Sequence, residues 1–433
     1  MSNWIARLQR FGLYLLALAL FLAPAGVSWG LGLLVLGFLM ELGVRIRQRR
    51  PWPASTALWL ILGLAVYALL RGWLANYPGG TWSVRWGAGL DWAQLAVVVP
   101  VAYVIGGNQR RLLRVLALAL LGMLLGAMYR LDWALLWADP AAFAESRPGF
   151  GVPTIVFALF SGTALIGLFT LRWRWWGGRH DSVHLLRIGL WLLVTALVAQ
   201  AFLLTLSRGA WLALAATAVL GLLLVASRRG RRRSPRLLTW LGGGAVAVLV
   251  LMNAGSMVER VTAEFDTARA LVQGEVGYVP DSSFSQRWHA QRFGLDLWQQ
   301  RPWLGWGPGS AKALLKASDD PSVMLTGYGP LEHLHNTYLE VLVQLGVVGL
   351  LLWLALFAAL WRSVQLACRA GSVDVDVGNF LLLSLVYLML WSLFDFHSMQ
   401  QAWRAYWGVL AGGMLAVGLF PRTARTEPGA GAG

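Results

Sequence analysis

The chain has 433 residues, of which 58% are hydrophobic and only 13% are charged, and its mean hydropathy is +0.59. This composition excludes a soluble globular domain as the main body of the protein, because such a domain does not need so much apolar surface. The net charge of +16 would suit a nucleic-acid binder, but the placement of the basic residues favours membrane topology over that class and over any nucleic-acid partner.

The apolar residues form runs long enough to cross a bilayer, which takes about 20 residues of α-helix. The first two runs form one long apolar stretch, interrupted near residues 24–26. The sequence therefore predicts an all-α polytopic membrane protein with about 12 transmembrane helices. The expected spans are residues 11–26, 28–44, 55–73, 88–106, 111–128, 153–171, 187–206, 209–226, 237–254, 336–361, 379–395 and 399–419.

Basic residues gather in alternate loops, as the positive-inside rule requires of cytoplasmic loops. These loops and both termini are therefore expected to face the cytoplasm. The residues between about 255 and 334, with seven basic and nine acidic side chains, then form one large loop on the periplasmic side. The basic runs are "RIRQRR" at 45–50, "NQRRLLR" at 108–114, "RWRWWGGRH" at 172–180 and "SRRGRRRSPR" at 227–236.

This topology divides the chain into four segments. We expect transmembrane helices 1–9 in residues 1–254, a periplasmic helical loop in 255–334, helices 10–12 in 335–420 and a disordered cytoplasmic tail in 421–433. The first apolar run also has features of a cleaved signal peptide. Since another apolar span follows it directly, we expect an uncleaved first helix.

The large loop shows helical patterns of its own. Residues 259–273 place four apolar side chains on one helical face, and Ser283 with Gln286 fits a capping box that would begin a helix just before Arg287. The stretch "RPWLGWGPGS" at 301–310 has too many Pro and Gly for a regular element, so we expect a tight turn anchored by tryptophan. A short helix should begin at Ser310. The loop is thus expected to be a helical cap.

Three basic residues on the periplasmic side are candidates for chemistry, because ionisable groups at a membrane edge are costly. Arg208, in "TLSRGAWLA", lies between two spans with almost no loop between them. Arg287 is at the start of a predicted helix, where backbone N–H groups favour an anion, and His335 begins the tenth span. Two guanidiniums can hold a phosphate by bidentate hydrogen bonds, and an imidazole can take a proton from a hydroxyl.

Each of these residues also has an ordinary interpretation. Arg208 would reach a lipid phosphate from the membrane edge, Arg287 would form a surface salt bridge, and His335 would be a solvated helix start. His289 and His333 are interpreted in this ordinary way only.

Asp395 is expected either to pair with Arg404 or to orient His335 or one of the arginines. We find no Asp/Glu or His/Cys cluster at metal-ligand spacing on the periplasmic side. The single cysteine, Cys368, excludes an internal disulfide and a cysteine-based metal site. We therefore expect no metal and no cofactor.

Four motifs between about residues 200 and 361 together resemble the signature of the O-antigen ligase family. His335 and Asn336, followed after nine residues by "GVVG" at 346–349, is similar to the His-Asn…Gly-x-x-Gly pattern of that family. Similar too are "SRGAWLA" at 207–213, the Ser-x-Arg that ends at Arg287, and "RPWLGWGPG" at 301–309. Gly346 and Gly349 are expected to allow close helix approach.

The resemblance implies a metal-independent, inverting glycosyltransferase of the C-type fold in the bacterial inner membrane, with its active site at the periplasmic face. Its partners would be membrane lipids, undecaprenyl-diphosphate-linked O-antigen as donor, and lipid A–core as acceptor. By position, Arg208 and Arg287 would hold the donor diphosphate and His335 would be the base. Asn336 and Glu332 would assist at the substrate.

Other functions remain open at this point. The O-antigen polymerase shares the motifs but often has two sizeable periplasmic loops, and the protein O-oligosaccharyltransferase usually has a longer C-terminal periplasmic portion. A lipid-linked glycan flippase without chemistry would place charges along a central cavity, whereas here they gather at one membrane face. The sequence thus favours the ligase.

Overall fold

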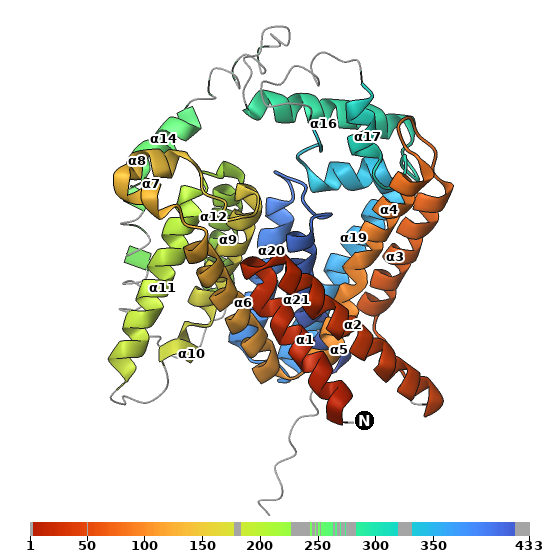
Figure 1. The fold of residues 1–433 in the computed structure, drawn as a ribbon, viewed down its shortest axis with the longest axis horizontal. Helices are drawn as coiled ribbons and strands as arrows, with labels where there is room; N and C mark the ends of the chain where they lie inside the picture. Colours follow the sequence, from red (N-terminus) through yellow and green to blue (C-terminus); the bar gives the residue numbers. More distant parts are fainter. Residues whose placement is uncertain are drawn as a thin grey trace, which may run out of the picture.

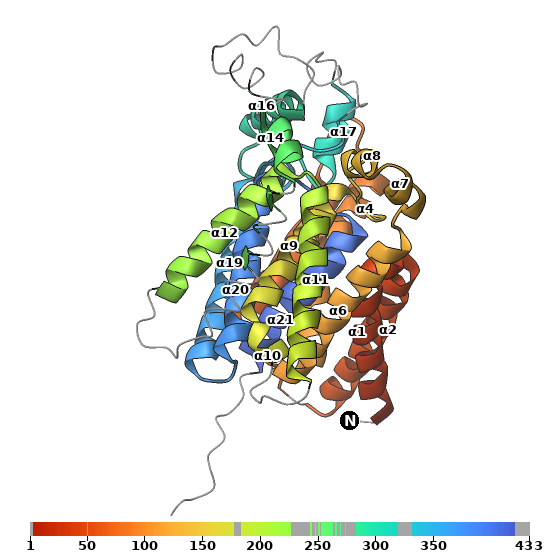
Figure 2. The same cartoon turned by 90° about the vertical axis from the view of Figure 1, so that its left-hand side faces the viewer.

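The computed structural model describes residues 3–49, 51–176, 183–226, 283–318 and 331–420, with further positions between 243 and 273. Every regular element within these ranges is a helix, and the long helices run side by side as one bundle (Figures 1 and 2). The predicted all-α fold is confirmed.

The N-terminal part of the bundle contains a tightly packed hairpin of α1 and α2, against which α6 packs. The elements are α1 (Asn3–Leu22), α2 (Pro24–Arg47), α3 (Thr56–Leu74), α4 (Trp82–Ala93), η1 (Gln94–Val97), α5 (Val98–Ile105), α6 (Gln109–Tyr129), α7 (Trp133–Ala138), α8 (Pro140–Glu145), α9 (Thr154–Thr170) and α10 (Arg172–Trp176).

The C-terminal part surrounds α21, a deeply buried helix that packs against α5 and α19. Its elements are α11 (His184–Leu204), α12 (Arg208–Ala226), α14 (Ala254–Thr262), α16 (Ser283–Gln300), α17 (Ser310–Lys316), α19 (Thr337–Arg369), α20 (Val375–Trp391) and α21 (Gln401–Leu419).

Many of these helices suit a membrane, so the protein is a polytopic α-helical membrane protein. Eleven of the expected spans coincide with helices, and the ninth, 237–254, lies largely outside the described residues. Within the described ranges, seven helices are long and apolar enough to cross a bilayer: Trp4–Leu22, Pro24–Arg47, Thr56–Leu74, Trp82–Ile105, Gln109–Tyr129, His184–Leu204 and Thr337–Arg369. Three shorter apolar helices are Thr154–Thr170, Arg208–Leu223 and Val375–Trp391.

The division between the first two helices was predicted a few residues too late. α1 ends at Leu22, Ala23 is extended, and Pro24 is the first residue of α2. Proline has no N–H to donate and its fixed φ suits the first helical position, so it begins the second helix instead of lying inside the first.

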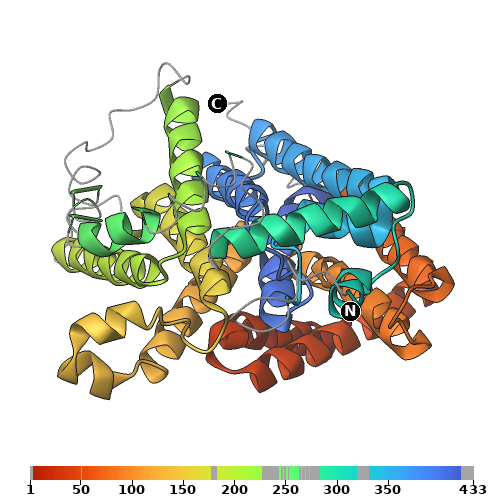
Figure 3. The same ribbon diagram turned by 90° about the horizontal axis from the view of Figure 1, so that it is seen from above.

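Helices α16 and α17 lie across one end of the bundle, here called the capped end (Figure 3). α16 begins at Ser283 and α17 at Ser310, and both starts confirm the predictions made for the large loop. Of the predicted helix at 259–273, α14 covers the beginning, and most of the remainder lies outside the described residues.

The turn at 301–309 forms backbone hydrogen bonds with α19 at a break in that helix. The backbone of α19 leaves the helical conformation at Gly346, which is left-handed with a φ of 67°. The carbonyl of Val343 accepts a hydrogen bond from the N–H of Trp306 at 2.7 Å, and that of Gln344 accepts one from Gly307 at 2.8 Å. A Cβ on Gly346 would clash with a carbonyl of the same turn. The expectation of helix–helix approach at this glycine was therefore wrong, because the close neighbour is a turn.

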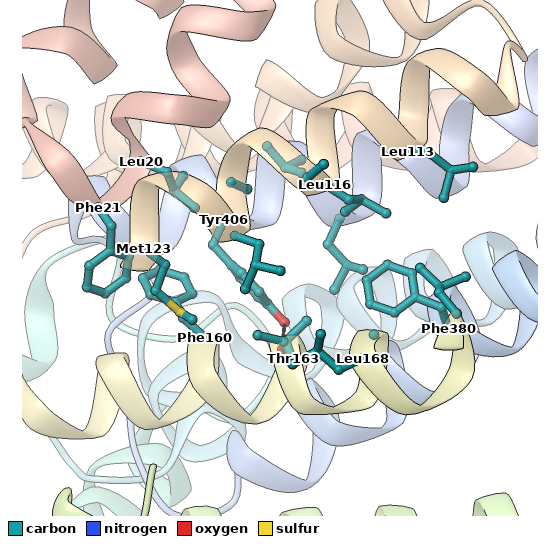
Figure 4. A pocket seen from close by; sticks show the side chains of 18 of the residues that line it. Leu20, Phe21, Leu113, Leu116, Met123, Phe160, Thr163, Leu168, Phe380 and Tyr406 are labelled. Atoms are coloured by element: carbon teal, nitrogen blue, oxygen red, sulfur yellow. Dashed lines mark hydrogen bonds between the residues drawn. The ribbon is translucent and has the colours of Figure 1, made fainter. Parts of the chain in front are cut away.

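A large apolar cavity, here called the crevice, lies inside the bundle between α6 and α9 (Figure 4). Its volume is about 420 Å³, and the two helices flank it with hardly any direct contact. Leucine and phenylalanine side chains dominate its wall. The hydroxyls of Thr163 and Tyr406 are hydrogen-bonded to each other at 2.8 Å, so this pair is already satisfied.

Candidate active site

A second, smaller cavity of about 210 Å³ lies at the capped end. It is formed by the starts of α9, α12 and α16 together with the loops at 146–153 and 392–400. Its wall holds four charged side chains, namely Arg147, Arg208, Arg287 and Asp395. We call it the arginine cavity. It brings together two predicted arginines and a predicted carboxylate that are far apart in the sequence.

Arg208 is the first residue of α12 and follows a tight turn. In this turn the hydroxyl of Thr205 donates to the carbonyl of Phe202 at 2.6 Å, and Leu206 is left-handed with a φ of 48°. At Gly209, a Cβ would lie 2.6 Å from the ring of Phe394, so only glycine lets the start of α12 approach the 392–400 loop this closely. The turn thereby fixes Arg208 at the cavity wall.

Arg287 is in the second turn of α16 and is partly buried. α16 packs against α19, so the position of Arg287 depends on the same helix that follows His335. The neighbouring Ser285 is 5% exposed and Ala290 is fully buried, which shows that this face of α16 points into the protein. The arginine therefore reaches the cavity from the cap.

Asp395 is the centre of a histidine cluster. Its Oδ1 accepts a hydrogen bond from Nε2 of His333 at 3.0 Å and one from the N–H of Phe396 at 2.7 Å. The Nδ1 atoms of His397 and His335 lie 3.1 and 3.6 Å from the same oxygen. Asp395 therefore does not pair with Arg404 but contacts His335, which was the other interpretation. Arg404 instead forms an ion pair with Asp91.

His335 lies just before α19 in a strained position. Its φ is 52°, a left-handed value that is uncommon for residues other than glycine, although histidine adopts it more often than most. Asn336 caps the helix, since its Oδ1 accepts hydrogen bonds from the next turn, including Leu339 N at 3.1 Å. The buried carboxylate of Glu340 accepts the N–H of Leu334 at 2.9 Å. These contacts hold His335 from both sides.

Left-handed backbone is concentrated around this site. Five residues other than glycine have a positive φ within the described ranges, and four of them are at the capped end: Arg147, Phe150, Leu206 and His335. Arg147 and Leu206 line the arginine cavity. Such strain persists only where surrounding contacts enforce it, and it clusters at functional sites.

Burial and neighbouring charges shift the pKa values of Asp395, His335 and His333 in different directions. Burial acts to raise the pKa of Asp395, but the contacts of its carboxylate with the three histidines outweigh it and hold that pKa well below its usual value. Burial lowers the pKa of His335, and positive charge at His333 and Arg287 adds to the effect against the opposing influence of Asp395. Burial opposes the charge of His333, yet its hydrogen bond to Asp395 raises its pKa overall. The site therefore combines an ionised carboxylate with a neutral His335 at neutral pH.

Three predicted residues are not part of the cavity wall. His335 is connected to it through its contact with Asp395. Glu332 is exposed and forms an ion pair with Lys312 at 2.7 Å. Asn336 uses its side-chain oxygen to cap α19. The assistance of Glu332 and Asn336 at a substrate stays a prediction.

Three residues that the sequence interpretation passed over belong to the site. His333 and His397 contact Asp395, and Arg147 lines the arginine cavity. His333 precedes His335 by two residues and could have been suspected on that ground. His397 follows the predicted Asp395 by two residues and could have been suspected in the same way. Arg147 is distant in sequence from the recognised motifs, so no local signal marked it.

The histidine cluster also corrects the statement that no group on this side has metal-ligand spacing. The ligand atoms of His333, Asp395 and His397 all lie within 4.8 Å of one another. Such a set of nitrogen and oxygen donors is suitable for a divalent cation. A cation at this position would have to displace the hydrogen bond between His333 and Asp395.

The fold and the site together define a multi-pass membrane protein with a charged cavity at one end of its helix bundle. The family model for O-antigen ligase matches residues 191–354, which include Arg208, Arg287 and His335. This part of the chain is therefore an O-antigen ligase family region, as the motifs indicated. A comparison with curated proteins gave no match. Arg147 and Asp395 lie outside the matched region.

Proposed function

We propose that the protein is an O-antigen ligase that transfers O-antigen en bloc from undecaprenyl diphosphate to a sugar hydroxyl of lipid A–core. The observation that carries this proposal is the convergence of Arg208 and Arg287 in one cavity with Asp395, whose carboxylate also contacts His335. The family match supports the transfer of a lipid-linked glycan. The positive-inside pattern supports a periplasmic site in the bacterial inner membrane.

The arginine cavity would hold the donor diphosphate. Arginine forms planar, bidentate hydrogen bonds with phosphate oxygens, and the low water content of a half-enclosed cavity strengthens them. A diphosphate is a good leaving group, so the main tasks of the protein are to align the attack and to stabilise the departing negative charge. Arg208 and Arg287 would perform both.

His335 would act as the base. Its Nδ1 faces the ionised carboxylate of Asp395, which favours a proton on that nitrogen. Nε2 is then the nitrogen that accepts a proton. A neutral imidazole in this tautomer can take the proton of the acceptor hydroxyl late in the attack.

The reaction then proceeds by direct displacement. The hydroxyl oxygen of the acceptor forms a bond with the anomeric carbon from the face opposite the diphosphate, while the bond between that carbon and the phosphate oxygen breaks. The bonding electrons leave with the diphosphate, and the hydroxyl proton moves to His335. Attack from the opposite face inverts the anomeric configuration.

The test is the lipopolysaccharide and carrier-lipid profile of a deletion strain, complemented with the wild type or with His335→Ala. For a ligase we expect core without O-chain in the deletion strain and in the variant, together with long polymer retained on undecaprenyl diphosphate. The wild type should restore the O-chain.

Two other outcomes would contradict the ligase assignment. Core that carries a single repeat unit would identify a polymerase. An unchanged lipopolysaccharide profile would exclude this pathway and direct attention to protein glycosylation or to lipid-linked glycan transport. A purified-protein assay with the same variant separates loss of catalysis from loss of expression.

A further inference from the structure

We propose that Arg147 is a third donor-binding arginine, which holds the diphosphate as its charge grows. This proposal rests on the proposed function, because it assigns a role within the same cavity. Arg147 lies in the loop between α8 and α9, outside the region matched by the family model. The proposal is based on the position of this one side chain and on the hydrogen bonds that hold it.

Arg147 is held at both its backbone and its side chain. Its carbonyl accepts a hydrogen bond from the hydroxyl of Thr154 at 3.2 Å, which ties it to the start of α9. Its Nε donates to the carbonyl of Thr205 at 3.2 Å, in the turn that immediately precedes Arg208. Its own φ of 52° is left-handed. These contacts place two arginines from distant segments on the wall of one cavity.

A second arginine near the same loop shows what a purely structural role looks like. Arg130 donates from Nη1 to the carbonyl of Phe21 at 2.7 Å and from Nη2 to that of Leu22 at 2.9 Å. It thus satisfies the C-terminal carbonyls of α1, and it does not line the arginine cavity. Arg147 uses Nε for its anchoring bond and lines the cavity with the same side chain.

The charges of the cavity agree with a diphosphate as ligand. Three guanidiniums and the carboxylate of Asp395 line it, so its wall is positive overall. In a sugar-linked polyprenyl diphosphate each phosphate carries a negative charge, and the bond that breaks during transfer leaves further negative charge on the outer phosphate. A third guanidinium therefore stabilises the more negatively charged leaving group more strongly than it stabilises the bound donor. Stronger stabilisation of the transition state than of the bound substrate is the condition for raising the rate of the chemical step.

The experiment compares Arg147→Lys and Arg147→Gln with Arg130→Lys in purified full-length protein. Two quantities are measured: the kcat of transfer and the competition of undecaprenyl diphosphate and undecaprenyl monophosphate for the donor site. We expect Arg147→Gln to lower kcat on the order of a hundredfold, Arg147→Lys to lower it less, and both to lose preference for the diphosphate. Arg130→Lys should keep that preference.

The outcomes separate this proposal from the proposed function. If the wild type transfers glycan and the Arg147 variants keep their preference for the diphosphate, the third-arginine proposal is overturned while the ligase stands. If the Arg147 variants lose thermal stability to the same extent as Arg130→Lys and keep kcat, their role is structural and the proposal is also overturned. If the wild type does not transfer glycan, the ligase proposal fails, and the competition measurement still decides whether Arg147 binds diphosphate.

Discussion

The two cavities of this protein differ in size, chemistry and construction. The crevice is about twice as large as the arginine cavity, at about 420 Å³ against about 210 Å³. Regular helices with leucine and phenylalanine side chains surround the crevice (Figure 4). Helix starts, loops and left-handed residues surround the arginine cavity, and charged groups line it.

The volume of a cavity in this protein and its suitability for a reaction are therefore different properties. The crevice is lined almost entirely by apolar side chains, and the one charged residue at its wall, Arg174, is ion-paired with Asp374 and Asp376. The arginine cavity is small, but it contains partly or fully buried charges, and hydrogen bonds hold Arg147 and Asp395 in place. Fixed charges of this kind are what a site for an ionic transition state requires. We therefore expect the crevice to accommodate hydrocarbon and the arginine cavity to be the place of the reaction.

The largest effect should come from removing the base. His335→Ala should lower kcat/KM by a factor on the order of 10² to 10⁴, because the variant lacks the imidazole that would take the acceptor proton. Transfer by purified protein is the measurement. His289→Ala, on α16, is the control and should keep normal activity. Normal transfer by the His335 variant would refute the base assignment.

The next largest effect should come from replacing the guanidiniums of the arginine cavity by ammonium groups, which keeps the charge but changes the hydrogen-bonding geometry. Arg208→Lys and Arg287→Lys should each lower kcat/KM by roughly tenfold to a hundredfold, since lysine cannot form the bidentate contact. Arg292→Lys is a matched control, because Arg292 is on the same helix as Arg287 but exposed. Near-full activity in both variants would show that the cavity does not hold the diphosphate.

A smaller effect with a definite pH signature is expected for Asp395→Asn. In the wild type kcat/KM should fall as the pH drops through the pKa of His335, which burial keeps below its ordinary value, because the neutral imidazole is the active form. Asp395 acts to raise that pKa, so its removal should move the acidic limb to lower pH. The plateau should also fall, on the order of tenfold, as His335 loses its oriented partner. A limb that moves to higher pH would contradict this arrangement.

The smallest effect is expected in the crevice. Ala164→Leu adds apolar volume there and should change kcat/KM by less than about threefold, while its extra buried surface should leave stability unchanged or raise it by about 1 kcal/mol. Activity and thermal unfolding of the same preparation give both values. A large loss of transfer without unfolding would show that the crevice takes part in the reaction, and the contrast between the two cavities would no longer hold.

Features that depend on neighbours in the chain were predictable. Apolar runs of sufficient length predict the helices, and Ser283 and Ser310 mark the starts of α16 and α17, because backbone hydrogen bonding within a helix is local. The glycines of the turn at 301–309 indicated its irregular path. The motifs also marked His335, Arg208 and Arg287 as candidates, although not their arrangement.

Contacts between distant segments could not be predicted in the same way. The partner of Arg404 is Asp91, more than 300 residues earlier, and nothing in either segment indicates it. The break of α19 at Gly346 exists because a turn some 40 residues earlier supplies the hydrogen bonds that the helix loses.

By itself, therefore, the sequence determined a membrane-spanning helical protein, the family that residues 191–354 match and three candidate residues for chemistry. These follow from hydropathy, helix periodicity and short motifs, which are properties of neighbouring residues. Only the tertiary structure decided that Asp395 contacts His335, that His333 and His397 share its carboxylate, and that Arg147 joins the two predicted arginines. Helix packing brings these side chains together from five separate segments, and spacing along the chain does not encode the distances that result.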